Sequence, residues 1–262
     1  MSAETAAALS AWLAALPVLL AVAAATWVVA TLKRNVTIVD TVWPLFFVLA
    51  AWLYAGAHEV PDARTALVVF VITAWGLRLA TYLAWRNRGH EEDRRYAAIR
   101  SRNEPGFAWK SLYLIFGFQA LLAWIVSMPL AGAITGDRPL GILDALGLAL
   151  WAVGMVFEAG GDWQLARFKR DPANRGRVMD RGLWRYTRHP NYFGDFCVWW
   201  GCYLMALSAG AWWTLPGPVL MSFLLMRFSG VRLLESDIGE RRPEYADYAR
   251  RTNAFFPGPP RS

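Results

Sequence analysis

Residues 8–31 read ALSAWLAALPVLLAVAAATWVVAT and contain no charged side chain. A bilayer-spanning helix needs about 20 mostly apolar residues, because the hydrocarbon core is about 30 Å thick and a helix rises about 1.5 Å per residue. This stretch is therefore long enough to cross a bilayer. Because residues 1–7 contain Glu4 and no basic residue, we expect no cleavable signal peptide, so that the stretch stays as a helix.

Apolar stretches of similar length recur along the whole chain. Of 262 residues, 56% are hydrophobic and 18% are charged, whereas about 25% are charged in an ordinary soluble domain. The charges also cluster, instead of covering a whole surface. We therefore predict an all-α integral membrane protein with about seven transmembrane helices. The expected spans are roughly 8–31, 38–57, 64–85, 111–134, 140–161, 191–209 and 211–234.

The positive charges of the loops predict the orientation. With seven helices, the basic segments all fall on one side, while the loops on the other side are nearly free of Lys and Arg. Because cytoplasmic loops carry an excess of Lys and Arg, we predict an N-terminus outside and a cytoplasmic C-terminus. The basic segments are 32–37, 86–110, 162–190 and the tail after 234.

The sequence favours a single domain without a metal site. The chain shows no internal repeat and no low-complexity linker, which favours a single polytopic membrane domain over 1–262, with a short mobile Pro/Gly tail at 257–260. Cys197 and Cys202 have no zinc spacing and are typical of small packing residues. We expect neither a metal nor a nucleic-acid partner.

Several acidic residues lie within or at the ends of the apolar stretches. Burying a carboxylate in hydrocarbon costs several kcal/mol, so such residues usually face a polar cavity and mark a site. The alternative is that they lie at the membrane interface and are solvated. These residues are Asp40, Glu158, Asp162, Asp195 and Glu235.

Arginines are dense on the predicted cytoplasmic side. Arg177, Arg185 and Arg188 lie in one short polar segment, and Arg78 lies within the third expected span. The guanidinium fork suits phosphate, which favours a phosphorylated cofactor entering from the cytoplasm. The alternative is that these charges only fix topology and contact anionic lipid.

Residues 182–195, GLWRYTRHPNYFGD, gather polar side chains at the mouth of the sixth expected span. Pro190 suits the first turn of a helix, and Asn191 and Asp195, four residues apart, then share one face. Gly194 permits a close backbone approach. The free amide groups of a helix N-terminus would favour an anion there.

Residues 188–195, RHPNYFGD, resemble the signature shared by membrane sterol reductases and the steroid 5α-reductase superfamily. The second half of the chain, from about 150 to 257, is similar to that superfamily in the order and spacing of its polar and glycine positions. Trp75-Gly-Leu-Arg78 and Asn87-Arg88-Gly89 resemble its third helix and the following loop. The best resemblance is to the bacterial branch, formerly a domain of unknown function.

The resemblance implies a seven-helix fold with NADPH as the hydride donor, in a bacterial inner membrane with the cofactor site facing the cytoplasm. It implies substrate-side helices in 1–110 and a cofactor-binding half in 111–262. The implied partners are membrane lipids and a 3-oxo-Δ4 steroid or similar lipid enone that enters from the bilayer and is reduced at its C4–C5 double bond. The implied cofactor-binding residues are Arg78, Asn87, Asp162, Lys169, Arg170, Arg177, Tyr186, Arg188, His189, Asn191, Asp195, Arg232 and Glu235.

The catalytic residues depart from the family pattern. In the animal steroid reductases a Glu and a Tyr donate hydrogen bonds to the enone oxygen, which stabilises the developing enolate. Here Trp75 occupies the tyrosine position, and Asp40 is the candidate substitute for the Glu. Because burial raises the pKa of a carboxyl group, a protonated Asp could donate. Tyr192, within the signature, is a second candidate donor.

Two other classes of protein fit part of the pattern. S-adenosylmethionine-dependent membrane methyltransferases, of the isoprenylcysteine carboxyl methyltransferase type, also carry an Arg-His-Pro motif before a helix and an acidic residue after the last span, as Arg188-His189-Pro190 and Glu235 do here. The extra arginines favour NADPH, which has three phosphates to neutralise. A transporter would be expected to show broken helices in paired halves, and we find no such pairing.

Overall fold

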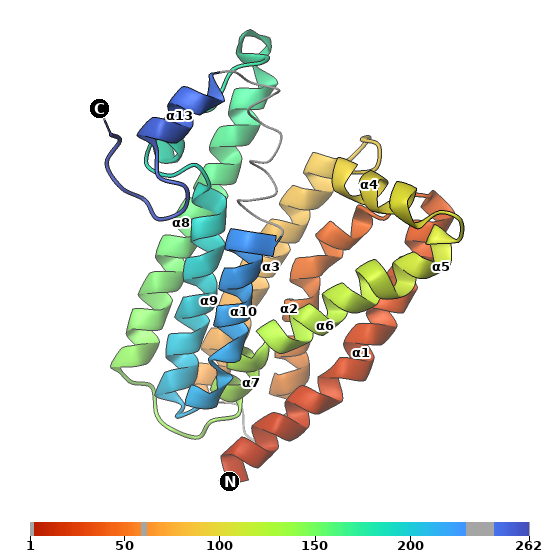
Figure 1. Cartoon of the computed structure of the whole chain (residues 1–262). Helices are drawn as coiled ribbons and strands as arrows, with labels where there is room; N and C mark the ends of the chain where they lie inside the picture. Colours follow the sequence, from red (N-terminus) through yellow and green to blue (C-terminus); the bar gives the residue numbers. More distant parts are fainter. Residues whose placement is uncertain (1–2, 59–61, 229–243, 262) are drawn as a thin grey trace. The chain divides into compact units, whose positions relative to one another are not determined.

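The computed structural model describes residues 3–58, 62–228 and 244–261. Within these ranges every regular element is a helix, which confirms the predicted all-α class (Figure 1). Five helical segments are long and apolar enough to cross a membrane. They are α1 (Ala3–Lys33), α2 (Ile38–Ala57), α3 (Ala63–Asn87), the run Phe107–Val126 and α8 (Ile142–Arg170).

These five segments coincide with the first five expected spans. The run Phe107–Val126 comprises α5 (Phe107–Ser111), the π-helix η1 (Leu112–Gly117) and α6 (Phe118–Val126), and α7 (Met128–Ile134) follows it. The sixth expected span forms α9 (Pro190–Ser208), which carries the polar residues of the motif. The seventh begins with α10 (Pro216–Phe223) and η5 (Leu224–Phe228), and its remaining residues lie outside the described ranges. The count of seven and the orientation stay predictions.

The chain divides into two compact units. Unit 1 comprises residues 1–141 and 205–217, and unit 2 comprises residues 142–204 and 218–262. The predicted division at residue 110, between substrate-side helices and a cofactor-binding half, was drawn on function and stays a prediction.

Unit 1 is held together by aromatic packing and by hydrogen bonds to backbone carbonyls. Trp12 and Trp124 stack with ring centroids 3.7 Å apart, and each indole N–H donates to the other's backbone carbonyl. Fully buried Arg64 donates to the carbonyls of Arg138 and Pro139. In lipid such polar contacts replace much of the hydrophobic driving force between helices.

Unit 2 is built on the close approach of α8 and α9. Glycines at Gly147, Gly154 and Gly161 of α8 recur every seven residues, and Gly194 and Gly201 of α9 do the same. A Cβ on Gly194 would lie 2.4 Å from the Glu158 amide nitrogen and 2.5 Å from the Gly154 carbonyl oxygen. Small residues let helix backbones approach this closely in membrane proteins. The predicted close approach at Gly194 is therefore confirmed.

The C-terminal segment packs against the start of α9, although the sequence predicts a mobile tail at 257–260. The Gly258 amide donates to the Tyr186 carbonyl, and the Thr187 hydroxyl donates to the Phe255 carbonyl. Phe255 also contacts Phe193 and Phe196 of α9. Proline and glycine in the segment did not reveal these aromatic contacts, because their partners lie about 60 residues earlier.

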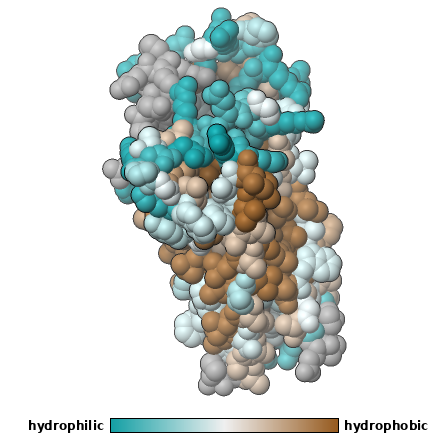
Figure 2. Space-filling view, turned by 90° about the vertical axis from the view of Figure 1, so that its right-hand side faces the viewer, coloured by the Kyte–Doolittle hydropathy of each residue, from teal (hydrophilic) through white to brown (hydrophobic). Residues whose placement is uncertain are grey.

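The surface follows the membrane assignment. On the face that Figure 2 shows, hydrophobic residues gather along the middle and hydrophilic residues gather at one end. Exposed tryptophans, which favour the membrane interface, include Trp85, Trp109 and Trp163. The chain is an integral membrane protein by the length and composition of its helices.

Candidate functional site

The motif segment forms a short polar turn and then enters α9. The 3₁₀ helix η3 (Gly182–Arg185) docks on α8, where the Trp184 indole donates to the Gly161 carbonyl and the Leu183 amide donates to Gln164. The helix α9 begins at Pro190, as predicted. Proline suits this position because the first turn of a helix leaves its amide groups unpaired.

Two of the predicted cofactor residues meet at the N-terminus of α9. The Asn191 side-chain amide lies 3.4 Å from an Asp162 carboxylate oxygen. Asp162 is a buried residue of α8. The preceding residue, Gly161, lies close to Pro190 and to the backbone nitrogen of Asn191. The positive end of the helix dipole favours a carboxylate at this place.

Two more buried carboxyl groups belong to the same pair of helices. Asp195 lies one turn after Asn191, and Glu158 lies one turn before Asp162; both are buried. Residues four apart share a helix face, so α8 and α9 each present two polar side chains. Within the described residues, no group of His, Cys, Asp and Glu is arranged to hold a metal ion.

Arg188 and His189 are engaged in local structure. The Arg188 guanidinium donates to the carbonyls of Ala249 and Thr252, at the C-terminal end of α13 (Tyr245–Arg251). A cation there complements the helix dipole. His189 is buried and stacks on Tyr192 with ring centroids 5.6 Å apart. A cofactor role for these two residues and the donor role of Tyr192 stay predictions.

Four further predicted residues of unit 2, which the structure describes, are exposed. Tyr186 is 46% exposed. Lys169 and Arg170 end α8, and Arg177 lies in the loop that follows. These cations lie outside the apolar part of α8, where a phosphate group could remain hydrated.

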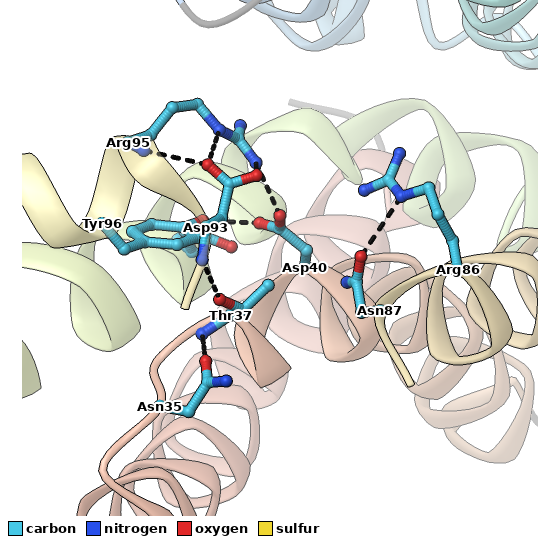
Figure 3. A network of polar contacts seen from close by, with 9 residues as sticks. Asn35, Thr37, Asp40, Arg86, Asn87, Asp93, Arg95 and Tyr96 are labelled. Carbon is cyan, nitrogen blue, oxygen red and sulfur yellow. Dashed lines mark hydrogen bonds and ion pairs between the residues drawn. The ribbon is translucent and has the colours of Figure 1, made fainter. Parts of the chain in front are cut away.

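A second polar cluster lies in unit 1, around Asp40 in the first turn of α2 (Figure 3). One Asp40 oxygen accepts a hydrogen bond from Arg95 at 2.7 Å, and the other accepts one from the Tyr96 hydroxyl at 2.5 Å. Both donors come from α4 (Arg94–Asn103). Gln119 of α6 donates to the same Tyr96 oxygen at 3.1 Å.

The protonation of this cluster assigns a donor. Burial raises the pKa of Tyr96 well above its ordinary value, and the Asp40 carboxylate raises it further. Burial opposes the charge of Arg95 and lowers its pKa, but the Asp40 carboxylate, Asp93 and Tyr96 together outweigh burial, so that the Arg95 pKa is raised. Tyr96 is therefore a neutral hydroxyl donor. Asp40 accepts hydrogen bonds at both oxygens, while its predicted role requires it to donate.

The loop before α4 holds this helix in place. The Glu92 carboxylate accepts hydrogen bonds from Arg100 and the Val36 amide; burial raises its pKa, but these donors outweigh burial and lower it. The Asp93 amide donates to the Thr37 hydroxyl, next to the start of α2. These bonds tie the Arg95–Tyr96 pair to the α1–α2 connection.

The other predicted residues of unit 1 lie on α3. Trp75 is fully buried and packs edge-on against Phe47, with ring centroids 5.8 Å apart. Arg78 lies one turn later. Asn87 ends the helix, and its side-chain oxygen Oδ1 accepts a hydrogen bond from the Arg86 side chain. The buried Asn87 amide nitrogen has no hydrogen-bond partner among the described residues.

A family comparison matches residues 26–252 to a model described as "Protein of unknown function (DUF1295)". The match covers most of the chain. The chain belongs to the DUF1295 family. That family lies within the steroid 5α-reductase superfamily, so the predicted family is confirmed.

Curated relatives of this DUF1295 protein cover different shares of it. An uncharacterized protein of Schizosaccharomyces pombe is 27% identical over 88% of this chain and 75% of its own length. The 3-oxo-5-alpha-steroid 4-dehydrogenases 1 of Mus musculus and Rattus norvegicus are each 39% identical over 30% of this chain. That alignment covers 29% of the mouse enzyme and 28% of the rat enzyme. No solved structure matches.

Two predicted residues of the DUF1295 protein, Arg232 and Glu235, lie outside the described ranges. The prediction missed Tyr96, although it is the single tyrosine in the basic segment 86–110 and stands next to Arg95. A buried aromatic residue in so charged a segment was the available signal. Gln119 carried no such signal, because a lone amide in an apolar helix fits many roles.

Proposed function

We propose that this protein is an NADPH-dependent membrane reductase that reduces the C4–C5 double bond of a 3-oxo-Δ4 steroid or a similar lipid enone. The observation that carries the proposal is the meeting of buried Asp162 with Asn191 at the N-terminus of α9, inside the RHPNYFGD segment. The family and the partial similarity to steroid dehydrogenases support the same reaction class.

The residues of unit 2 fit a dinucleotide by their chemistry. Carboxylates and an amide, as in Asp162, Asp195 and Asn191, suit the hydroxyl groups of a ribose and the carboxamide of a nicotinamide. Exposed cations after α8, including Arg170 and Arg177, suit phosphates. NADPH, when bound, supplies the hydride.

In unit 1, the proposal assigns polarisation of the enone oxygen to Tyr96. The Tyr96 hydroxyl has one proton and donates it to Asp40 in this structure. To polarise the substrate, the hydroxyl must therefore release Asp40 and donate its hydrogen bond to the enone oxygen. Gln119 would meanwhile keep donating to the Tyr96 oxygen, and Arg95 would keep neutralising Asp40. A preorganised donor of this kind stabilises the charge that develops on the oxygen. Asp40 is then a positioning residue, and Trp75 forms part of the apolar wall.

The first test is cofactor choice, measured by thermal unfolding in mild detergent. A ligand at about 100 times its dissociation constant stabilises a protein by about 2.7 kcal/mol. We expect NADPH to raise the melting temperature, and S-adenosylmethionine to have no effect. Asn191→Ala and Asp195→Asn should reduce the NADPH shift, whereas Asp137→Asn, at an exposed carboxylate, should retain it. Stabilisation by S-adenosylmethionine alone would instead make the protein a methyltransferase and overturn the proposal.

A further inference from the structure

A basic groove lies at the end of α8, within unit 2. Its volume is about 600 Å³, and it is lined by residues of α8 and of the loop that follows, among them Trp163, Arg167, Arg170, Asp171 and Arg181. Three arginines thus face one carboxylate. The Asp171 carboxylate is already used, because it accepts a hydrogen bond from the Ala173 amide. Counted over its described lining residues, the groove therefore presents net positive charge to an anionic ligand.

The groove lies where α8 would leave the bilayer. The helix has 29 residues, which is about 43 Å of length against a hydrocarbon core of about 30 Å. Its apolar part carries exposed side chains that face outward, such as Val153 at 45% and Val156 at 64% exposure. Trp163, 60% exposed, follows them at the position that suits an interfacial anchor.

With Trp163 at the membrane interface, Arg167, one turn beyond it, reaches the depth expected of lipid phosphate. One helical turn is about 5.4 Å, and the headgroup layer on each side of the bilayer is of similar thickness. The Arg167 guanidinium lies over the Trp163 ring, 5.6 Å from its centroid. This contact directs the cation toward the membrane side of its own turn.

We propose that this groove is a binding site for an anionic phospholipid. The phosphate lies between Arg167 and Arg181, and an acyl chain lies along the exposed apolar face of α8 beyond Trp163. Continuity of the cationic groove with a membrane-facing apolar surface favours a lipid over a soluble anion. The groove does not include Asp162, Asn191 or Asp195, but it includes Arg170, which is also a proposed cofactor residue. The lipid phosphate is placed at Arg167 and Arg181 instead, so the inference does not depend on the proposed reductase activity.

The test measures lipid binding by the full chain in detergent, by native mass spectrometry with phosphatidylglycerol and phosphatidylcholine. The test variant is Arg167→Gln/Arg181→Gln. The control is Arg94→Gln/Arg102→Gln, two exposed arginines of α4, which makes the same change in net charge. Because each arginine near a membrane surface contributes about 1 kcal/mol of attraction to anionic lipid, the test variant should bind phosphatidylglycerol about 30-fold more weakly. The control should change less than about twofold, because Arg94 and Arg102 do not line the groove.

Further arms separate the sources of phosphate. Trp163→Ala should lower the affinity for phosphatidylglycerol, and soluble glycerol phosphate should not compete with the lipid for binding. If both double variants lose affinity equally, or if neither does, the groove is no lipid site. If Arg167→Gln/Arg181→Gln weakens the binding of NADPH and leaves the binding of phosphatidylglycerol unchanged, the groove binds the nucleotide and the lipid proposal is wrong. Since lipid binding needs no cofactor, failure of the reductase proposal leaves this result interpretable.

Discussion

At the scale of single residues, the Asp40 cluster separates two ways of stabilising an enolate. In the proposed reaction a carboxyl donor must offer an O–H to the substrate, whereas both Asp40 oxygens accept hydrogen bonds, one from Arg95 and one from Tyr96. A buried tyrosine hydroxyl has such an O–H, because burial itself keeps it protonated. Tyr96 satisfies this condition at 6% exposure. The structure therefore favours the hydroxyl over the carboxyl group as the donor.

The substitution Tyr96→Phe tests this assignment. Loss of one preorganised donor lowers kcat by about 10²–10³-fold. We expect such a fall in NADPH consumption with a 3-oxo-Δ4 steroid, with the NADPH-induced thermal shift retained. Tyr113→Phe, at a tyrosine that is 61% exposed, is the control and should keep full turnover. Full turnover by Tyr96→Phe would move the donor role to Tyr192.

The sequence predicted the residues of α8 and α9 better than those around Asp40. Asn191 and Asp195 could be placed on one face because their spacing within a single helix fixes their relation. Asp40 could be recognised by its depth, but its partners Arg95 and Tyr96 are more than 50 residues away. Arg188 was predicted to bind a cofactor, and its contacts to Ala249 and Thr252 depend on how α13 folds back.

At the scale of elements, glycine spacing explains why α8 and α9 can carry buried polar groups. Seven residues are close to two helical turns, so Gly154 and Gly161 lie along one stripe of α8. The backbone of α9 approaches this stripe closely at Gly194. The close approach leaves little room for lipid or water near Glu158, which is 2% exposed. The close packing of α8 against α9 thus also creates the buried surroundings of their polar side chains.

The substitution Gly194→Ala should disrupt this contact. Its Cβ would meet backbone atoms at 2.4 and 2.5 Å, so the helices must separate. Overpacking of this kind costs about 1–3 kcal/mol, and we expect a melting temperature several degrees lower. Gly56→Ala is the matched control, since a Cβ on Gly56 meets nothing within 4 Å. There a better helix former should leave stability unchanged or slightly raised. Equal melting temperatures for the two variants would contradict the close-packing argument.

Element boundaries followed from the sequence where apolar length defines them. The expected spans 38–57 and 64–85 agree closely with α2 (Ile38–Ala57) and α3 (Ala63–Asn87). The π-helix Leu112–Gly117 within the fourth span was not predicted, because apolar composition does not distinguish it from an α-helix. The docking of the tail was missed for a similar reason, since long-range aromatic contacts leave no local pattern.

At the scale of the whole molecule, the orientation rests on the contrast between basic and neutral loops. Lys and Arg gather at 86–110 and 162–190, while the loop 135–139 has only Arg138. Within unit 1, a Cβ on Gly210 would lie 2.6 Å from the Arg138 guanidinium carbon, which places these two weakly charged turns together. Buried Arg64 also binds the backbone at Arg138 and Pro139. The same end of unit 1 therefore collects the segments that the charge rule predicts to be outside.

Single cysteines expressed in intact bacterial cells test this orientation. We expect a membrane-impermeant maleimide to label Asp137→Cys from outside and Ser101→Cys only after permeabilisation, because both positions are exposed but lie in opposite predicted compartments. The native thiols give an internal control: Cys197 and Cys202 are buried, so the unmodified chain should remain unlabelled. The reverse pattern would invert the topology and place the basic groove of α8 outside. Labelling of both positions from one side would instead require an even number of crossings between them, where the prediction has one, the span 111–134, and would contradict the seven-span prediction itself.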